Sequence, residues 1–418
     1  MRPQPIPSHC APGTTARSNA PPPAWPPSGG QAGEPHPSSS AIDCAANKHV
    51  KPRNQHYRHL NAGPHQRSQL WIQTGPFKRR CDLIGFVNGL PLVFIELKRH
   101  DKGLKAAFDD NYTDYKDTIP RLFHYNALVI VSNGLDARFG SITSTWDHFY
   151  RWKRLNEDDT DPAPKHDEAP LKPVLPILLR GMCTKGALLD IVENFILFDS
   201  SEEVTLKVVA RNHQYIGVNK AIAKLASGDA EVQAGKLGVF WHTQGSGKSY
   251  SMVFFCQKVH RRVSAAYTFV LLTDRKELDD QIYTTFVGCG VSTNKTDKAT
   301  GAEGLERLLR DQNRRYVFSL IHKFRKRVTE PWTTRREIIV LSDEAHRTQY
   351  GRLATQMRMA LRQAAFLAFT GTPLIDSKNG TRPRRCSART CRSTIFSARW
   401  PMARPCRCTT KTVAKSLG

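Results

Sequence analysis

The sequence predicts an α/β protein with two folded parts between tails that have no fold. Between residues 205 and 376, short apolar runs alternate with helix-like stretches, which indicates a parallel sheet covered by helices. A shorter α/β pattern covers residues 73–155. Residues 1–72 are rich in Pro, Ser, Gly and Ala and lack apolar periodicity, so we expect a disordered tail there.

The first folded part contains a hairpin signal. Apolar runs at 83–87 and 92–95 predict strands, and Asn88-Gly89 between them is a typical turn sequence. A helical stretch at 104–116 and a buried strand at 127–131 follow. Residues 73–155 are therefore expected to form a small α/β domain.

The rest of the chain divides into three segments. Residues 156–204 begin with an acidic, Pro-rich linker and continue as a helical stretch over 175–198. Residues 377–418 contain eight Arg, four Cys and no acidic residue, and they lack apolar periodicity, so we predict no fold there. In residues 205–376 we expect strands at five short apolar runs, namely 237–241, 268–273, 316–321, 338–341 and 366–369.

Composition excludes some classes of protein and favours none. The formal net charge is +25, but the tails at 1–80 and 377–418 carry +8 and +11 of it, so the charge argues only weakly for nucleic-acid binding. The 10 cysteines include no CxxC pair, which argues against a zinc site or a disulfide framework. No apolar run is long enough to span a membrane and no signal pattern opens the chain, so we expect a cytoplasmic protein.

A phosphate-binding loop is predicted directly after the strand at 237–241. Gly245, Ser246, Gly247, Lys248 and Ser249 stand between this strand and a helix-like run. Glycines allow backbone N–H groups to face phosphates, and the helix N-terminus adds positive potential. We expect Lys248 to neutralise the β- and γ-phosphates of ATP and Ser249 to ligate Mg²⁺. His242 replaces the usual first glycine of such loops.

A second motif follows a buried strand about a hundred residues further on. Asp343-Glu344-Ala345-His346 stands at the end of that strand. We expect Asp343 to hold Mg²⁺ and Glu344 to orient or activate the attacking water. His346 fits a coupling residue better than a metal ligand, since no second His lies at ligand spacing.

A nuclease pattern lies in the first folded part. Asp82, Glu96 and Lys98 fit a D…ExK arrangement, in which two carboxylates hold Mg²⁺ and a lysine stabilises charge on the scissile phosphate. A strict two-residue turn at Asn88-Gly89 would place Asp82 opposite Ile95 and away from Glu96. The nuclease hypothesis therefore predicts a three-residue turn or a bulge, either of which pairs Asp82 with Glu96.

With these motifs, residues 205–376 resemble superfamily 2 helicases. The resemblance implies a RecA-like lobe and includes Thr243 and Gln244 in the phosphate loop. It also implies an adenine contact by Gln214. Further residues are implied to contact nucleic acid or to couple it to ATP, namely Asp274 and Arg275 in motif Ia, and Thr370, Gly371 and Thr372 in motif III.

Over residues 80–376 the chain also resembles the restriction (motor) subunit of type I restriction-modification enzymes. The resemblance rests on residues 82–91, 94–98, 125–128, 178–182, 188–190 and 242–249. It implies a PD-(D/E)xK-like nuclease domain ahead of the lobe, with ATP and Mg²⁺ as cofactors. It further implies translocation and cleavage of unmodified double-stranded DNA together with specificity and methyltransferase subunits. The family's Gln-x-x-x-Tyr motif becomes Asn111 and Tyr115.

Both ends of the chain depart from the family pattern. We expect a truncated copy whose tails are out-of-frame or mis-called, and therefore little ATP hydrolysis, translocation or cleavage by this chain alone. Two alternatives stay open. One is a superfamily 2 translocase without cleavage, and the other is a non-catalytic DNA-binding fragment held by its basic tails.

Overall fold

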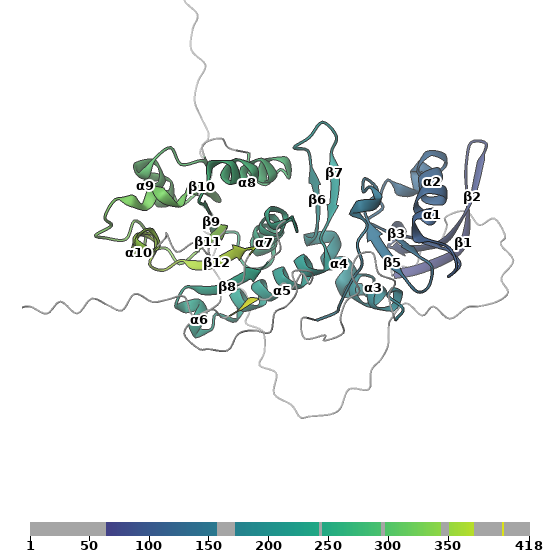
Figure 1. Cartoon of the computed structure of the whole chain (residues 1–418), viewed down its shortest axis with the longest axis horizontal. Coiled ribbons are helices and arrows are strands. Elements are labelled where there is room, and N and C mark those ends of the chain that lie inside the picture. The colour runs from purple at the N-terminus through teal and green to yellow at the C-terminus, as the bar shows by residue number, and fades with distance from the viewer. Residues whose placement is uncertain are drawn as a thin grey trace, which may run out of the picture. The chain divides into compact units, whose positions relative to one another are not determined.

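The computed structural model describes residues 64–156, 172–241, 245–293, 297–343 and 351–371, together with the backbone of 395–396 (Figure 1). All of them belong to one unit of the chain, Ala41–Gly418. The described residues form a mixed α/β structure with a five-stranded sheet, a six-stranded sheet and a two-stranded hairpin. In this part of the chain, no helix is both long and apolar enough to cross a membrane.

The N-terminal sheet has the strand order β1-β2-β3-β4-β5. All neighbouring strands are antiparallel except β3 and β4, which are parallel. Its elements are β1 (Pro64–Thr74), β2 (Phe77–Val87), β3 (Leu90–Leu97), α1 (Leu104–Ala106), the π-helix η1 (Ala107–Tyr112), α2 (Thr113–Thr118), the 3₁₀ helix η2 (Pro120–Phe123), β4 (Leu128–Ser132), β5 (Ala137–Gly140) and the 3₁₀ helix η3 (Trp146–His148).

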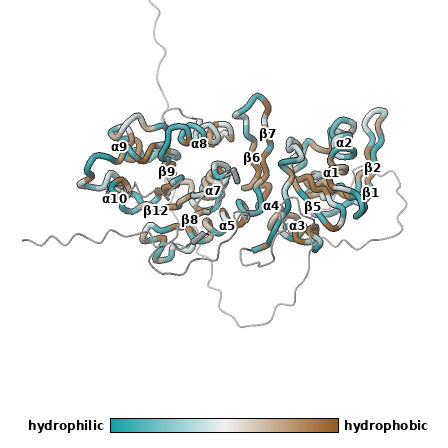
Figure 2. The backbone as a smooth tube through the Cα atoms, viewed as in Figure 1, coloured by the Kyte–Doolittle hydropathy of each residue, from teal (hydrophilic) through white to brown (hydrophobic). Residues whose placement is uncertain are grey.

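This sheet encloses an aromatic core on one face. Phe94 of β3 contacts Tyr112, Tyr115 and Phe123 with ring centroids 5.2–6.1 Å apart. Alternation along β3 explains this, because Phe94 faces the helices while Val93 and Ile95 face the other core. Within this N-terminal part of the chain, the strands at the centre of the sheet contain the most hydrophobic residues (Figure 2). The packing fixes helices η1 and α2 against the end of β3.

The six-stranded sheet has the order β10-β9-β11-β12-β8-β13, and all pairs are parallel except β8 with β13. The five predicted strands are all present, with ends within two residues of expectation. They are β8 (Lys236–Trp241), β9 (Thr268–Thr273), β10 (Tyr316–Leu320), β11 (Ile338–Asp343) and β12 (Ala365–Thr370). This arrangement is consistent with a RecA-like lobe.

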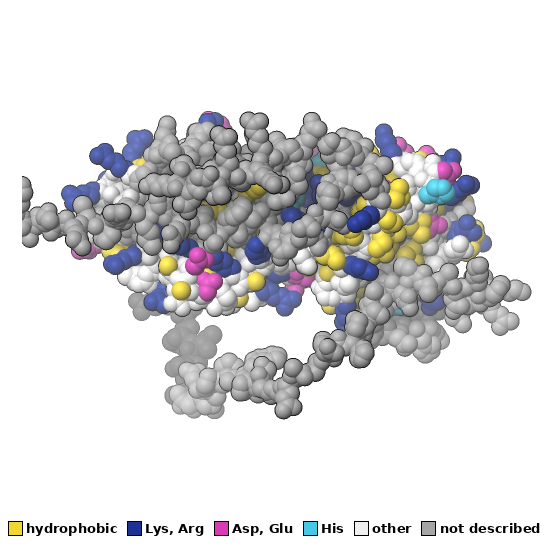
Figure 3. All heavy atoms as spheres, turned by 60° about the horizontal axis from the view of Figure 1, so that its bottom comes forward, with side chains coloured by type: hydrophobic (Ala, Val, Ile, Leu, Met, Phe, Trp, Pro, Cys, Tyr) yellow, Lys and Arg dark blue, Asp and Glu magenta, His cyan; other side chains and the backbone are white. Residues whose placement is uncertain are grey.

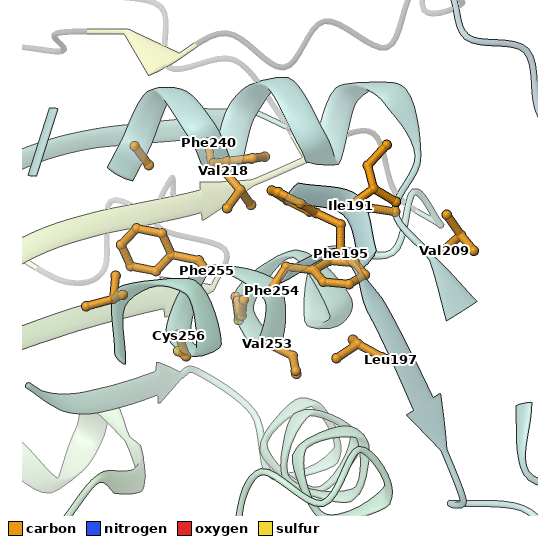
Figure 4. Close-up of a cluster of buried hydrophobic side chains, with 14 of the residues drawn as sticks. Ile191, Phe195, Leu197, Val209, Val218, Phe240, Val253, Phe254, Phe255 and Cys256 are labelled. Atoms are coloured by element: carbon orange, nitrogen blue, oxygen red, sulfur yellow. The ribbon is translucent and has the colours of Figure 1, made fainter. Parts of the chain in front are cut away.

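The remaining helices surround this sheet or lead to it from the N-terminal sheet. They are α3 (Leu175–Met182), α4 (Lys185–Asn194), α5 (Asn212–Ser227), α6 (Ala230–Gln233), α7 (Lys248–Arg262), α8 (Lys276–Gly288), α9 (Ala302–Arg310), the 3₁₀ helix η5 (Ile321–Arg325) and α10 (Gly351–Ala360). Figure 4 shows Phe195 beside Phe254, near Val218 and Phe240. These buried side chains hold α5 and α7 against the strand that leads into the phosphate loop.

The structure differs from expectation at three places. Strand β1 begins at Pro64, inside the stretch 1–72 expected to be disordered, because it pairs along most of β2. The predicted helix over 175–198 is wrong at its end, where β6 (Ile196–Asp199) pairs with β7 (Leu206–Val209). Strand β13 (Ile395–Phe396) pairs with β8 inside 377–418, where we predicted no fold. Residues 1–63 and the rest of 377–418 lie outside the described residues.

The close approach of α5 to β8 gives a test of the packing. A Cβ added at Gly217 would lie 2.2 Å from Cζ of Phe240, a buried ring that stacks on Phe369. We expect Gly217→Ala to lower the free energy of unfolding by about 1–3 kcal/mol, because the overpacked ring has nowhere to move. Urea denaturation followed by circular dichroism measures the change.

Gly186 of α4 provides the control, since an added Cβ there meets no atom within 4 Å. We expect Gly186→Ala to leave stability unchanged or to raise it by up to about 1 kcal/mol. Equal effects of the two substitutions would contradict the packing described for α5.

Candidate active sites

The phosphate loop reaches its helix through two glycines with left-handed backbone. Gly245 has φ of 77° and Gly247, the residue before α7, has φ of 83°. Only glycine adopts such angles readily, which explains the residue type at both positions. A Cβ added at Gly245 would meet nothing within 4 Å, so the loop is open on that side. His242, Thr243 and Gln244 lie outside the described residues.

Lys248 and Asp343 meet at the carboxyl edge of the parallel sheet. Lys248 is the first residue of α7 and Asp343 the last of β11, and Nζ lies 3.1 Å from Oδ1. Both side chains are largely buried, with exposed fractions of 15% and 6%. Ser249 follows Lys248 and is half-buried. The two predicted motifs are thus in direct contact although they are about a hundred residues apart.

Helix α5 is hydrogen-bonded to the phosphate loop. Gln214, buried at the start of α5, donates from Nε2 to the carbonyl of Gly247 at 2.9 Å and to Oγ of Ser251 at 3.2 Å. Its Oε1 accepts from the backbone N–H of Arg211 at 2.8 Å and thereby caps the helix. The amide that we expected to contact adenine is therefore engaged with the loop, and the adenine contact stays a prediction.

His213 is a neighbour of the loop that the sequence motifs did not single out. Its Nε2 lies 3.2 Å from the carbonyl oxygen of Ser246. Burial lowers the pKa of His213 to about 3, and Arg211 adds to the effect. The imidazole is therefore neutral at physiological pH and donates to the carbonyl. Its position next to Gln214, in the first turn of α5, was the available signal.

The remaining motor residues lie at the same sheet edge. Asp274 and Arg275 directly follow β9. Thr370 ends β12 and is fully buried, and the carbonyl of Gly371 accepts a hydrogen bond from Trp241 Nε1 at 3.2 Å. Parallel pairing brings these strand ends together. Glu344, His346 and Thr372 lie outside the described residues, so their predicted roles stay predictions.

The β2–β3 hairpin has the register that the nuclease hypothesis requires. The turn has two residues, with positive φ at Asn88 and Gly89, and it pairs Val87 with Leu90. One extra residue, Leu92, then bulges between Pro91 and Val93, after which Leu83 pairs with Ile95. The shift brings Asp82 next to Glu96, and Asp82 Oδ2 accepts from the backbone N–H of Leu97 at 2.9 Å.

Glu96 is almost completely buried, with an exposed fraction of 1%. The pKa of its carboxyl group is raised to about 7, mainly by burial and also by the nearby charge of Asp82, whereas the hydrogen bond from Asn111 acts in the opposite direction. Oε1 accepts that bond, whereas the buried Oε2 has no hydrogen-bond partner among the described residues. A buried oxygen without a donor beside a second carboxylate suits a divalent cation.

Asn111 and Tyr115 act on this site from one helical segment. Asn111 lies in the π-helix η1, whose wider turn projects one residue toward the strands. Its amide reaches Glu96 although it is one methylene shorter than the glutamine of the resembling family. Tyr115 lies four residues later, and its hydroxyl donates to the carbonyl of Arg80 at 3.2 Å. The pair therefore holds β3 and β2 at the two carboxylates.

Lys98 completes the predicted set. Its backbone N–H donates to the carbonyl of Ser132 at 2.8 Å, which fixes the end of β3 against β4, and its side chain is half-buried. Its positive charge lowers the pKa of Glu96. No group of three or more His, Cys, Asp or Glu side chains is gathered as a metal site within the described residues. Two protein carboxylates with further oxygens from water and substrate are a common way of holding Mg²⁺.

Comparisons with known proteins match the two parts of the chain that contain these sites. Residues 65–148 match the family model of the type I restriction enzyme R protein N terminus, and residues 213–385 match the SWI2/SNF2 ATPase model. The chain is 38% identical over 320 residues to the HindI type I restriction enzyme endonuclease subunit of Haemophilus influenzae, covering 71% of this chain and 30% of that protein. It is 35% identical over 331 residues to the MjaIXP endonuclease subunit of Methanocaldococcus jannaschii, covering 74% and 31%. The chain thus spans about a third of the length of these relatives.

The raised pKa of Glu96 predicts how stability depends on pH when no metal is present. The folded chain holds this proton up to about pH 7, whereas an unfolded glutamate loses it near 4.5. Folding stability should therefore fall as pH rises through this window, by an amount on the order of 3 kcal/mol at most. Thermal unfolding in EDTA between pH 4.5 and 8 measures the fall.

Glu96→Gln should remove most of this loss, so the variant becomes more stable than the native chain at pH 8 and equal to it at pH 4.5. Glu202→Gln, an exposed position, serves as the control and should follow the native chain. A native chain that gains stability from pH 5 to 7 through Glu96 would contradict the burial described for it.

Proposed function

Because the chain belongs to the family of type I restriction enzyme endonuclease subunits, we propose that it contributes ATP-dependent translocation and cleavage of unmodified DNA. One observation carries the proposal. The same chain has a half-buried Asp82 beside the buried Glu96, and a phosphate loop whose Lys248 contacts Asp343. A motor without cleavage has no use for the first of these sites.

In the proposed nuclease site, Asp82 and Glu96 hold Mg²⁺ within a PD-(D/E)xK-like domain. The metal, when bound, stabilises negative charge on the scissile phosphate. Asn111 holds Glu96 in place through Oε1 and leaves Oε2 free to face the cation. Lys98, two residues beyond Glu96 on the same strand end, supplies a positive charge to the same phosphate.

In the proposed motor site, Lys248 exchanges the carboxylate of Asp343 for the β- and γ-phosphates of ATP. Asp343 and Ser249 are then placed to hold Mg²⁺, and Glu344 to orient water. Gln214 and His213 keep the carbonyls of Gly247 and Ser246 turned away from the phosphates, so that the N–H groups of the loop face them. Asp274, Arg275, Thr370 and Gly371 then connect this edge to DNA.

The proposed partners follow from the family. They are double-stranded DNA and the specificity and methyltransferase subunits of a type I restriction-modification complex, in the cytoplasm. The weak turnover that we expect of this chain alone stays a prediction, and the measurements below separate binding from turnover.

Replacing Lys248 tests the nucleotide site without requiring hydrolysis. We expect Lys248→Ala to weaken binding of a fluorescent ATP analogue with Mg²⁺ by roughly ten- to a hundredfold, since a charge-assisted contact to phosphate is lost. Lys185→Ala, an exposed change in α4, should leave binding unchanged. Equal binding by both variants would favour a non-catalytic DNA-binding fragment.

Replacing the two carboxylates tests cleavage. We expect Asp82→Asn and Glu96→Gln each to reduce Mg²⁺-dependent nicking of plasmid DNA by roughly a hundredfold or more, because a metal ligand is lost. Asp147→Asn, an exposed change in the same domain, is the control. If nicking persists in both carboxylate variants, the nuclease assignment is wrong and the translocase alternative gains.

A further inference from the structure

The outer part of the β1–β2 hairpin, residues 70–81, extends beyond the strand that carries Glu96. Pairing of β2 with β3 reaches only as far as Leu83 with Ile95, whereas β1 and β2 continue together to Thr74 with Phe77. We call residues 70–81 the arm. In Figure 1 the two long strands project past the end of their sheet. The arm therefore has surface that the N-terminal sheet does not cover.

The arm exposes an aromatic ring between two cations. Trp71 is 49% exposed, which is unusual for so large an apolar side chain. Its cross-strand partner is Arg80, whose Cζ lies 5.8 Å from the ring centroid, and Nζ of Lys78 lies 5.0 Å from it. Lys78, Arg80 and Trp71 share one face because Lys78 and Arg80 are two residues apart on a strand.

The positive charge of the β1–β2 hairpin is not neutralised by acidic residues of the hairpin itself. Residues 64–81 contain four Lys and Arg side chains and no Asp or Glu. Arg79 forms an ion pair with Asp114 at 2.6 Å, whereas neither Lys78 nor Arg80 has an ion pair among the described residues. Figure 3 shows Lys and Arg spread over the visible face of the whole chain. What distinguishes the arm is therefore the exposed ring between its cations.

The arm is attached rigidly to the proposed nuclease site. Arg80 lies two residues before Asp82, which corresponds to about 7 Å along a strand. The Arg79–Asp114 pair and the bond from Tyr115 to the carbonyl of Arg80 fix its base to α2, the helix that directly follows Asn111 and η1. Arg79 and Cys81 face α2, so Arg80 and Lys78 project from the other face of the arm. A DNA strand that leaves a phosphate held at Asp82 and Glu96 would meet them along the edge of β2 beyond Leu83, where pairing with β3 has ended.

We propose that the arm binds the DNA strand next to the scissile phosphate. Lys78 and Arg80 contact its phosphates, and Trp71 stacks on a sugar or an unstacked base. The inference rests on the proposed nuclease function, because two carboxylates repel a polyanion and nearby cations offset that repulsion. An aromatic ring between cations is the surface that polynucleotide strands commonly bind.

The test measures DNA binding by the full-length chain at several salt concentrations. The chain is titrated into a labelled 20-base-pair duplex in buffer that contains Ca²⁺ in place of Mg²⁺, and fluorescence anisotropy gives the Kd for DNA. We expect Lys78→Gln with Arg80→Gln to reduce the slope of log K against log salt by about 2, one unit for each lost phosphate contact. The matched control, Arg121→Gln with Lys185→Gln, removes two exposed cations elsewhere and should keep the native slope.

Trp71→Ala should weaken binding roughly five- to a hundredfold with an unchanged slope, and Trp71→Phe should recover much of the loss. Lys78→Gln with Arg80→Gln should lower the slope by about 2 in a Glu96→Gln background as well, where cleavage is lost, which separates the arm from the nuclease assignment. A native slope in the Lys78/Arg80 variant, or no binding by the native chain, would overturn the inference. So would equal losses in the variant and its matched control.

Discussion

Parallel pairing of β8, β9, β11 and β12 is the constraint on which the motor lobe depends. No residue of these strands is exposed, and each strand delivers its following residues to one edge. A loop after β8 therefore meets a carboxylate from β11 across the intervening β12. The buried contact between Lys248 and Asp343 exists only because the strands end level. The sheet thus sets where these side chains meet. Local geometry is then adjusted by the two loop glycines, by the hydrogen bonds from Gln214 of α5, and by the hydrogen bond between Trp241 and Gly371.

The nuclease-like site depends instead on the burial of a carboxyl group, which is energetically unfavourable for its charged form. Glu96 is placed where water cannot solvate its charge, and one of its oxygens has no donor among the described residues. A fold chosen for stability alone would have an apolar residue there. The π-helix at 107–112 has the same character, because it sacrifices regular helical hydrogen bonding to bring Asn111 to that carboxylate.

Much of this arrangement was predictable, for identifiable reasons. The five strands of the motor sheet were found because buried parallel strands are continuous apolar runs, and the need for a bulge was found because side chains alternate with a period of two. Three features were not found. Strand β1 has a polar, partly exposed sequence, β6 follows a helix with similar apolar spacing, and the engagement of Gln214 with Gly247 depends on how α5 meets the loop.

The bulge at Leu92 has a consequence for how such a site is lost. The residues beyond it keep their strand in either register, but their phase relative to β2 is set by this single residue. An in-frame deletion of one codon here would leave the hairpin paired while turning Glu96 away from Asp82. One deletion during evolution would therefore abolish cleavage without replacing either acidic residue. The D…ExK motif would still be present in the sequence of such a protein, although its site no longer forms.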